Sequence, residues 1–168
     1  QLPDNTSQDA RMKRLLPLIL LASLAFPAAA EVQSYDQPIH DAARAGNGDN
    51  VRSLLKADPK QREARTGHGS TPLHLAATNP DTTAMQALIA AGANVMARDN
   101  DGATPLHMAA YSSRAKNVQM LLEAGADPSA KTDNGRDAGS MARKVKADEA
   151  AGVLSLWVLK GCKAGKPC

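Results

Sequence analysis

The small and apolar positions of this chain recur with a spacing of 33 residues between His74 and His107. In the first unit these positions are Ala76-Ala77, Met85, Leu88-Ile89 and Gly92-Ala93-Asn94. At the same offsets the second unit has Ala109-Ala110, Val118, Leu121-Leu122 and Gly125-Ala126-Asp127. A period of about 20–50 residues is typical of stacked repeats rather than of a closed globule.

Each unit predicts two short helices. Thr71-Pro72 suits the start of the first helix, because Thr caps helices and Pro lacks an N–H that would be unpaired there. Met85, Leu88 and Ile89 recur at helical spacing and predict the second helix, which Gly92 ends. Helices this short are not stable alone, so the pattern predicts that neighbouring units stack on each other.

The predicted fold is an all-α repeat, a solenoid with degenerate end repeats. We expect about four repeats, at residues 35–65, 66–98, 99–131 and 132–159 of a repeat domain that spans residues 31–160. One additional residue separates the repeat at residues 35–65 from the repeat at residues 66–98. The charged, Gly- and Pro-containing segment 57–69 predicts a loop that absorbs it.

Two copies of one tetrapeptide carry a family resemblance. They are Thr71-Pro72-Leu73-His74 and Thr104-Pro105-Leu106-His107. With the Ala-Ala, Leu-Leu and Gly-Ala-Asp positions, they resemble the ankyrin repeat over residues 35–157. The resemblance implies helix pairs joined by hairpin-like loops. It weakens at Ala57-Asp58-Pro59 and at Arg136-Asp137-Ala138-Gly139, which we interpret as end caps.

The N-terminal segment has the pattern of an export signal. Met12-Lys13-Arg14 precedes an apolar run at residues 15–26, and Ala28-Ala29-Ala30 follows it. The run is shorter than the roughly 20 apolar residues of a membrane span, although an uncleaved signal anchor is the alternative. We therefore expect a signal peptide at residues 12–30, cleavage after Ala30, and a bacterial protein that is periplasmic or secreted. Residues 1–11 are interpreted as an upstream extension.

The net charge and the cysteine content limit the classes of partner and of chemistry that the sequence allows. The formal net charge of +3 is small, and no basic face is interleaved with aromatic residues, which disfavours nucleic acid and membrane surfaces as partners. The two cysteines, Cys162 and Cys168, lie in a tail at residues 161–168. In an oxidising compartment a disulfide between them is expected. A redox or metal role and pairing with another chain are the alternatives.

The histidines do not predict catalysis. His40, His74 and His107 occupy one repeat position, and the resemblance implies that each imidazole bonds Thr and nearby backbone, tying one unit to the next. Layers about 10 Å apart cannot share one metal ion. His68 lies outside the framework and should be exposed. No nucleophile, phosphate-loop or zinc motif is present, so we expect no enzyme activity, no cofactor and no metal.

The C-terminal segment 148–159 predicts a last helix. Val153, Leu154, Trp157 and Val158 recur as one apolar face, so we expect a helix that caps the open end of the stack. An exposed Trp157 that anchors a partner is the alternative.

The resemblance implies that variable positions contact a partner protein. At the loop tips these are His68, Ser70, Arg98, Asn100, Asp101, Ala103, Asp133, Asn134 and Arg136. On the first helices they are Arg44, Thr78, Asn79, Tyr111, Ser112 and Lys144. We expect a monomeric, non-catalytic module that scaffolds, protects or inhibits another exported or envelope protein. An immunity-type inhibitor of a toxin enzyme and a redox-responsive accessory protein of oxidative stress are the alternatives.

Overall fold

A computed structural model of the chain describes residues 36–165. Within that range every regular element is helical: α1 (Pro38–Arg44), α2 (Gly48–Ala57), the 3-10 helix η1 (Pro59–Glu63), α3 (Pro72–Ala76), α4 (Thr83–Ala90), α5 (Pro105–Tyr111), α6 (Ala115–Glu123), α7 (Ala138–Lys144) and α8 (Asp148–Leu159). They belong to the compact unit Ser34–Cys168. The predicted upstream extension 1–11, the predicted signal peptide 12–30 and Cys168 lie outside the described residues.

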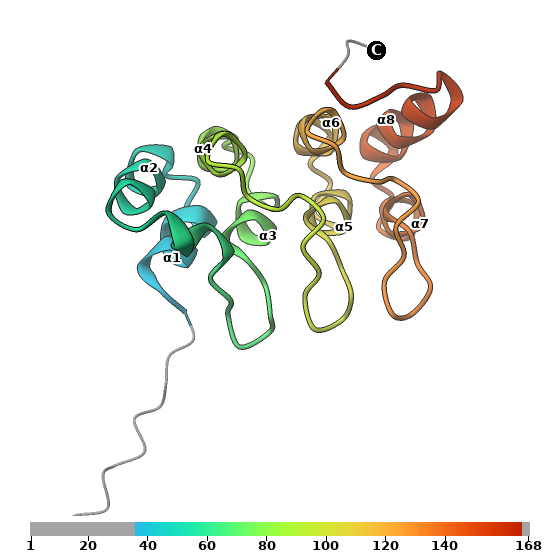
Figure 1. Cartoon of the computed structure of the whole chain (residues 1–168). Helices are drawn as coiled ribbons and strands as arrows, with labels where there is room; N and C mark the ends of the chain where they lie inside the picture. Colours follow the sequence, from blue (N-terminus) through green and yellow to red (C-terminus); the bar gives the residue numbers. More distant parts are fainter. Residues whose placement is uncertain (1–35, 166–168) are drawn as a thin grey trace, which may run out of the picture. The chain divides into compact units, whose positions relative to one another are not determined.

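The α-helices form two layers along a stack (Figure 1). In one layer α1, α3, α5 and α7 pack against each other in sequence order. In the other layer α2 packs against α4, and α6 packs against α8. Each first helix also packs against the second helix that follows it. The predicted all-α repeat stack is therefore confirmed.

A continuous apolar core runs between the two layers. Leu73 and Leu106, at the same repeat position of α3 and α5, are both 0% exposed. Ala76 and Ala109, which lie three residues further on, are also 0% exposed. The small alanine side chains let neighbouring first helices approach closely, whereas the leucines fill the space between layers. Each helix pair thus buries its apolar side only because another pair covers it.

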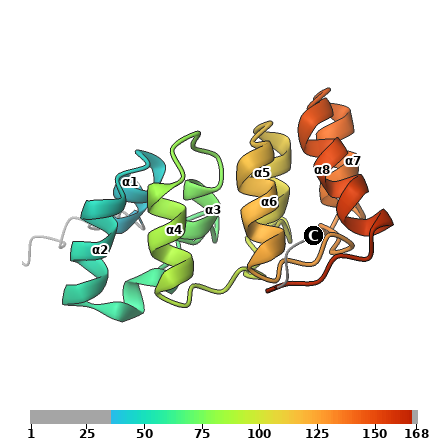
Figure 2. The ribbon, with the colours of Figure 1, turned by 90° about the horizontal axis from the view of Figure 1, so that it is seen from above.

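The spacing within the second layer is uneven. α4 and α6 are not among the closely packed pairs, and Figure 2 shows them further apart than α2 and α4. At the start of α2, a Cβ on Gly48 would lie 2.7 Å from the backbone of Thr83. The corresponding residue of α4 is the buried Thr82, and that of α6 is Ala115. Small residues thus accompany close packing, and the larger Thr82 accompanies the wider junction.

The connection between the first two repeats, predicted as a loop, is a 3-10 helix in its first part and non-helical at residues 64–71. The segment contains η1, which begins at Pro59 and is capped by Asp58, whose carboxylate accepts a hydrogen bond of 3.0 Å from the Lys60 N–H. This turn keeps the connection hydrogen-bonded, because the Ala64 N–H at its end donates to the Gln61 carbonyl oxygen at 3.0 Å.

The last helix covers α6 and α7. Leu154 and Trp157 are 4% and 7% exposed, so they face the core. Val158 was expected on the same face but is 61% exposed, because it lies one helical step beyond the buried Trp157. None of the helices between residues 36 and 165 is long and apolar enough to cross a bilayer.

Candidate functional site

His74 is fully buried in α3 and joins two repeats. Its Nδ1 accepts a hydrogen bond of 3.1 Å from the Thr71 N–H and lies 2.8 Å from the Thr71 hydroxyl oxygen. Its Nε2 lies 3.0 Å from the carbonyl oxygen of Ala103, in the next repeat. Because a carbonyl only accepts, the Nε2 carries the proton and Nδ1 is the acceptor. These contacts are the ones that the resemblance implies.

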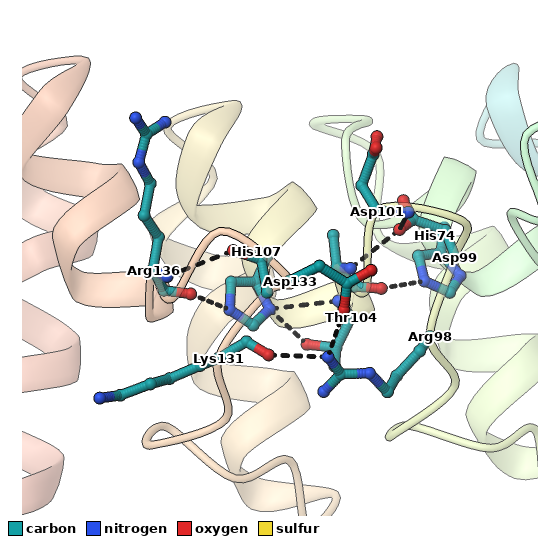
Figure 3. Close-up of polar contacts among 11 residues, drawn as sticks. His74, Arg98, Asp99, Asp101, Thr104, His107, Lys131, Asp133 and Arg136 are labelled. Carbon is teal, nitrogen blue, oxygen red and sulfur yellow. Dashed lines mark hydrogen bonds and ion pairs between the residues drawn. The ribbon is translucent and has the colours of Figure 1, made fainter.

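His107 makes the same contacts one repeat later. Its Nδ1 accepts from the Thr104 N–H at 3.1 Å, and its Nε2 lies 3.1 Å from the Arg136 carbonyl oxygen (Figure 3). Burial lowers the pKa of both His74 and His107 below the ordinary value of 6.5, although the carbonyl partners act in the opposite direction. Both imidazoles are therefore neutral crosslinks between repeats at pH 7.

His40 is a variant of this arrangement at the first repeat. Its Nδ1 accepts a hydrogen bond of 2.8 Å from the N–H of Gln37, which stands where the other repeats have Thr. Its Nε2 lies 3.0 Å from the carbonyl oxygen of Ala64, just after η1. Gln37 and His40 thus cap α1 without a threonine. His40 also bonds the connection between the first two repeats, through the Ala64 carbonyl oxygen.

Tight hairpin loops precede α3, α5 and α7 (Figure 1). In the second hairpin, Gly102 donates to the Asp99 carbonyl oxygen at 3.0 Å, and Asp99 donates to the Ala103 carbonyl oxygen at 2.9 Å. Gly102 has φ of +72°, a left-handed conformation that glycine adopts without strain. A Cβ at Gly102 would also collide with the carboxylate of Asp133 in the next hairpin. Glycine is therefore needed for both the turn and the stacking.

Backbone hydrogen bonds join the tips of successive hairpins. Asn100 donates its N–H to the His68 carbonyl oxygen at 3.0 Å, and Asp133 donates to the Asp101 carbonyl oxygen at 3.0 Å. The Asn100 side chain also donates to the Gly67 carbonyl oxygen at 3.2 Å. The tips thus form one connected edge rather than three independent loops.

A ladder of basic residues reinforces this edge. Arg65 donates to the carbonyl oxygens of Gly69 at 2.7 Å and of Arg98 at 2.6 Å. Arg98 in turn donates to the carbonyl oxygen of Lys131 at 2.9 Å and to the carboxylate of Asp133 at 3.2 Å (Figure 3). Arg98 was expected to contact a partner, but its guanidinium already connects two hairpins. The 33-residue spacing of Arg65, Arg98 and Lys131 could have revealed this ladder from the sequence.

Most of the residues predicted to contact a partner are on the surface. The exposed ones are Arg44, His68, Arg98, Asn100, Asp101, Tyr111, Asp133, Asn134, Arg136 and Lys144. The partly exposed ones are Thr78, Asn79 and Ser112. Ser70 and Ala103 are 8% and 6% exposed, so their placement on the surface is wrong. They close the base of their hairpins, where each exchanges hydrogen bonds across the turn.

Asn117 is a buried polar side chain that the sequence analysis missed. It is 1% exposed, and its amide nitrogen donates to the carbonyl oxygens of Ala77 at 2.9 Å and Asn79 at 2.7 Å. From the preceding turn Arg114 donates to the Thr78 carbonyl oxygen at 2.9 Å. These side chains bridge the junction where α4 and α6 are not closely packed. Ala84 and Ala150, one period on either side of Asn117, mark its position as internal.

Two hollows flank the first hairpin. One of about 540 Å³ is lined by Asp36, Arg44, Thr66, Gly67, His68, Ser70 and Leu75. The other, also of about 540 Å³, is lined by Arg65, Thr66, Gly67, Gly69, Arg98 and Asn100. The first hollow places Arg44, at the end of a first helix, on the same surface as the hairpin residue His68. Within residues 36–165 no cluster of His, Cys, Asp and Glu side chains has the arrangement of a metal site.

Helix pairs that stack through buried histidines, with hairpins along one edge, define a helical-repeat protein whose exposed face is available to a partner. The family model for ankyrin repeats matches residues 39–132 in three copies, and the chain belongs to this family. Ankyrin repeats mediate protein–protein interactions. The match ends before α7, where Asp137 and Gly139 depart from the repeated motif. No curated protein matches the chain.

Proposed function

We propose that this protein is an exported, non-catalytic module that binds another exported or envelope protein. Its binding face consists of one column of first-helix residues, Arg44, Thr78, Tyr111 and Lys144, together with the hairpin-tip residues His68, Asn100, Asp101 and Asn134. The column residues occupy one repeat position yet differ in charge and size. Positions that vary while their neighbours repeat are free to match a partner.

Exposure of Tyr111 carries this proposal. Its side chain is 52% exposed at the end of α5, and the other exposed large apolar side chains of the described chain are all on α8. An exposed tyrosine places part of an aromatic ring in water and adds little to the apolar core. Tyr supplies a large contact area with little loss of side-chain entropy on binding. Tyr111 therefore supplies the apolar centre of the binding face.

The charges around Tyr111 favour a polar rim. Arg44 forms ion pairs of 3.1 Å with Asp36 and 2.8 Å with Asp41, and all three side chains are exposed. Asp101 and Lys144 add charges of opposite sign along the stack. Exposed charges of this kind contribute little to folding, but they orient a partner through charge complementarity.

Site-specific photocrosslinking in cells that produce the whole chain tests the binding face. A benzoylphenylalanine in place of Tyr111 keeps an aromatic ring there, and the same group in place of exposed Lys116 on α6 is the control. We expect a covalent adduct with one exported protein from position 111 and none from position 116. Equal adducts from both positions, or none from either, would contradict the proposal. An adduct with a secreted toxin enzyme would instead support the immunity-type alternative.

Export is tested separately by cell fractionation and intact-mass measurement. We expect the chain in the periplasmic or secreted fraction, with a mass that corresponds to a start at Glu31. A chain that remains in the cytoplasm, or retains residues 12–30, would rule out the cleaved signal peptide. That outcome would leave the binding face itself untouched, so the two parts of the proposal can fail independently.

A further inference from the structure

The outer side of α8 exposes large apolar side chains, unlike the outer side of α6. On α6 the exposed side chains are all polar: Lys116, Gln119 and Glu123. On α8 the exposed apolar side chains are Leu156 at 54%, Val158 at 61% and Leu159 at 81%. An end repeat that faces water needs a polar outer face. α8 therefore does not have the surface of a simple end cap.

The exposed residues of α8 form a stripe opposite the buried ones. Asp148, Gly152, Ser155, Leu156 and Leu159 follow the spacing of a single helix face. The opposite side carries Ala150, Leu154 and Trp157, which are at most 7% exposed. The inner side of α8 is thus apolar, and the outer side exposes two leucines beside the polar residues Asp148 and Ser155.

A hollow of about 450 Å³ continues this apolar surface. Its lining includes Gly139 of α7 and Leu154, Ser155, Val158 and Leu159 of α8. Gly139 stands one period after Leu106, which is 0% exposed and fills the corresponding space in the third repeat. Beside Gly139 the hollow is lined by charged groups, because Arg143 Nη1 and Asp137 Oδ1 lie 3.2 and 3.3 Å from the position of a Cβ, so the apolar part of its lining belongs to α8.

The charges at the two ends of α8 indicate which kind of molecule covers its outer side. Asp148 and Glu149 lie in the first turn, whereas Lys160 and Lys163 follow the last turn. None of these four side chains forms an ion pair among the described residues. A second α8 that runs antiparallel places its basic end against the acidic end of the first, and the reverse.

We propose that the α8 face binds the same face of a second copy of this chain. The two α8 helices cross antiparallel about a two-fold axis near Ser155, which brings Leu159 of each copy over Gly152 of the other. A Cβ at Gly152 would meet nothing within 4 Å in the single chain, so space for a facing side chain is present. This pairing leaves the binding face of each copy exposed.

Light scattering on the whole, untagged chain tests the pairing over a concentration series. We expect the mass of two copies at high concentration and a dissociation constant raised at least about tenfold by Leu156→Asp with Leu159→Asp. Gln86→Asp with Ala90→Asp is the matched control, because both residues are exposed, lie on α4 and add the same two charges outside α8. Thermal unfolding establishes that the variants fold. A single-copy mass for the unchanged chain at every concentration, or a double variant that still pairs, would overturn the proposal.

A charge swap tests the antiparallel orientation. Glu149→Lys places like charges at both ends of the pair, so we expect weaker pairing. Lys160→Glu in the same chain restores opposite charges and should recover most of the lost affinity. Residues 149 and 160 are too far apart on one helix to pair with each other, so recovery reports a contact between copies. If the double variant pairs as poorly as Glu149→Lys, the antiparallel arrangement is wrong.

Discussion

The buried side and the exposed side of the repeat unit differ in how closely they repeat. On the buried side, Thr71 and His74 recur as Thr104 and His107 with nearly the same hydrogen-bond distances. On the exposed side, one column reads Arg44, Thr78, Tyr111 and Lys144. Stacking imposes the same geometry on each junction, whereas a partner imposes no such repetition. Variation at exposed positions therefore identifies the surface that is available for binding.

The hairpins show that exposure alone does not identify a contact residue. Arg98 is exposed, yet it recurs from Arg65 and bonds the backbone of the next hairpin. Arg98 is exposed because the hairpins that it joins lie along the edge of the stack. An exposed residue whose side chain makes no repeated structural contact is the stronger candidate for partner binding, and Tyr111 meets both conditions.

Replacing a buried histidine should have the largest effect. His74→Ala removes the bond to the Ala103 carbonyl oxygen, uncaps α3 and leaves a cavity, so we expect a loss of about 3–4 kcal/mol in the free energy of unfolding. Urea denaturation measures it. His68→Ala is the matched control and should cost less than about 0.5 kcal/mol, because His68 is exposed. Equal losses would contradict the distinction between the two sides.

The junction between the second and third repeats should be the next most sensitive. Asn117→Ala leaves the carbonyl oxygens of Ala77 and Asn79 without this donor, and we expect a loss of about 2 kcal/mol. Gln119→Ala, on the exposed side of the same helix, should cost less than about 0.5 kcal/mol. A loss at Asn117 no larger than at Gln119 would mean that the junction does not depend on this amide.

A pair of glycine replacements separates turn strain from hairpin stacking. Gly92 and Gly102 have similar φ values of +77° and +72°, but a Cβ meets nothing at Gly92 and meets Asp133 at Gly102. Gly92→Ala should cost about 1 kcal/mol through backbone strain alone. We expect Gly102→Ala to cost about 1 kcal/mol more, because the Asp133 carboxylate and the Arg98 guanidinium must shift and give up the contact between the hairpins. Similar denaturation midpoints for the two variants would contradict close stacking.

The free energy of unfolding should decrease as the pH is lowered below 6.5. Burial lowers the pKa of His74 and His107 in the folded chain, so below the ordinary value of 6.5 the unfolded chain binds protons that the folded chain does not. The free energy of unfolding then decreases by at most about 1.4 kcal/mol per pH unit for each histidine. In the His74→Ala variant, the free energy of unfolding should depend less steeply on pH, because the contribution of His74 is absent. A flat profile between pH 7 and pH 5 would show that the imidazoles titrate normally.

Much of the stack could be predicted from the sequence, because a residue that recurs at the same repeat position has the same local role in each repeat. Thr71, Pro72 and Gly92 predict helix ends, and the recurrence of His74 and His107 predicts a common structural role. Parts that depend on a single position were missed. The 3-10 turn η1 occurs once, and Asn117 replaces an alanine at only one junction.

The candidate binding residues were harder to predict, because exposure depends on distances between repeats. Ser70 and Ala103 are polar or small and follow a turn glycine, as loop-tip residues do, yet the hairpin folds back and buries both. Val158 lies next to Trp157 in the sequence, but the neighbouring pair of helices covers only one of them. Neither outcome follows from residue type without the packing of the adjacent repeat.

The most direct test replaces the whole exposed column, Arg44, Thr78, Tyr111 and Lys144, with alanine in one chain. Urea denaturation and photocrosslinking from a neighbouring, partly exposed position, Ser112 replaced by benzoylphenylalanine, are then measured on the same protein. We predict a free energy of unfolding within about 1 kcal/mol of the unchanged chain, together with loss of the crosslinked partner. Arg44, Tyr111 and Lys144 are exposed, and Thr78 contributes one hydrogen bond of 2.8 Å to the Leu75 carbonyl oxygen. Retention of the partner by a folded variant would contradict the assignment of this column to binding.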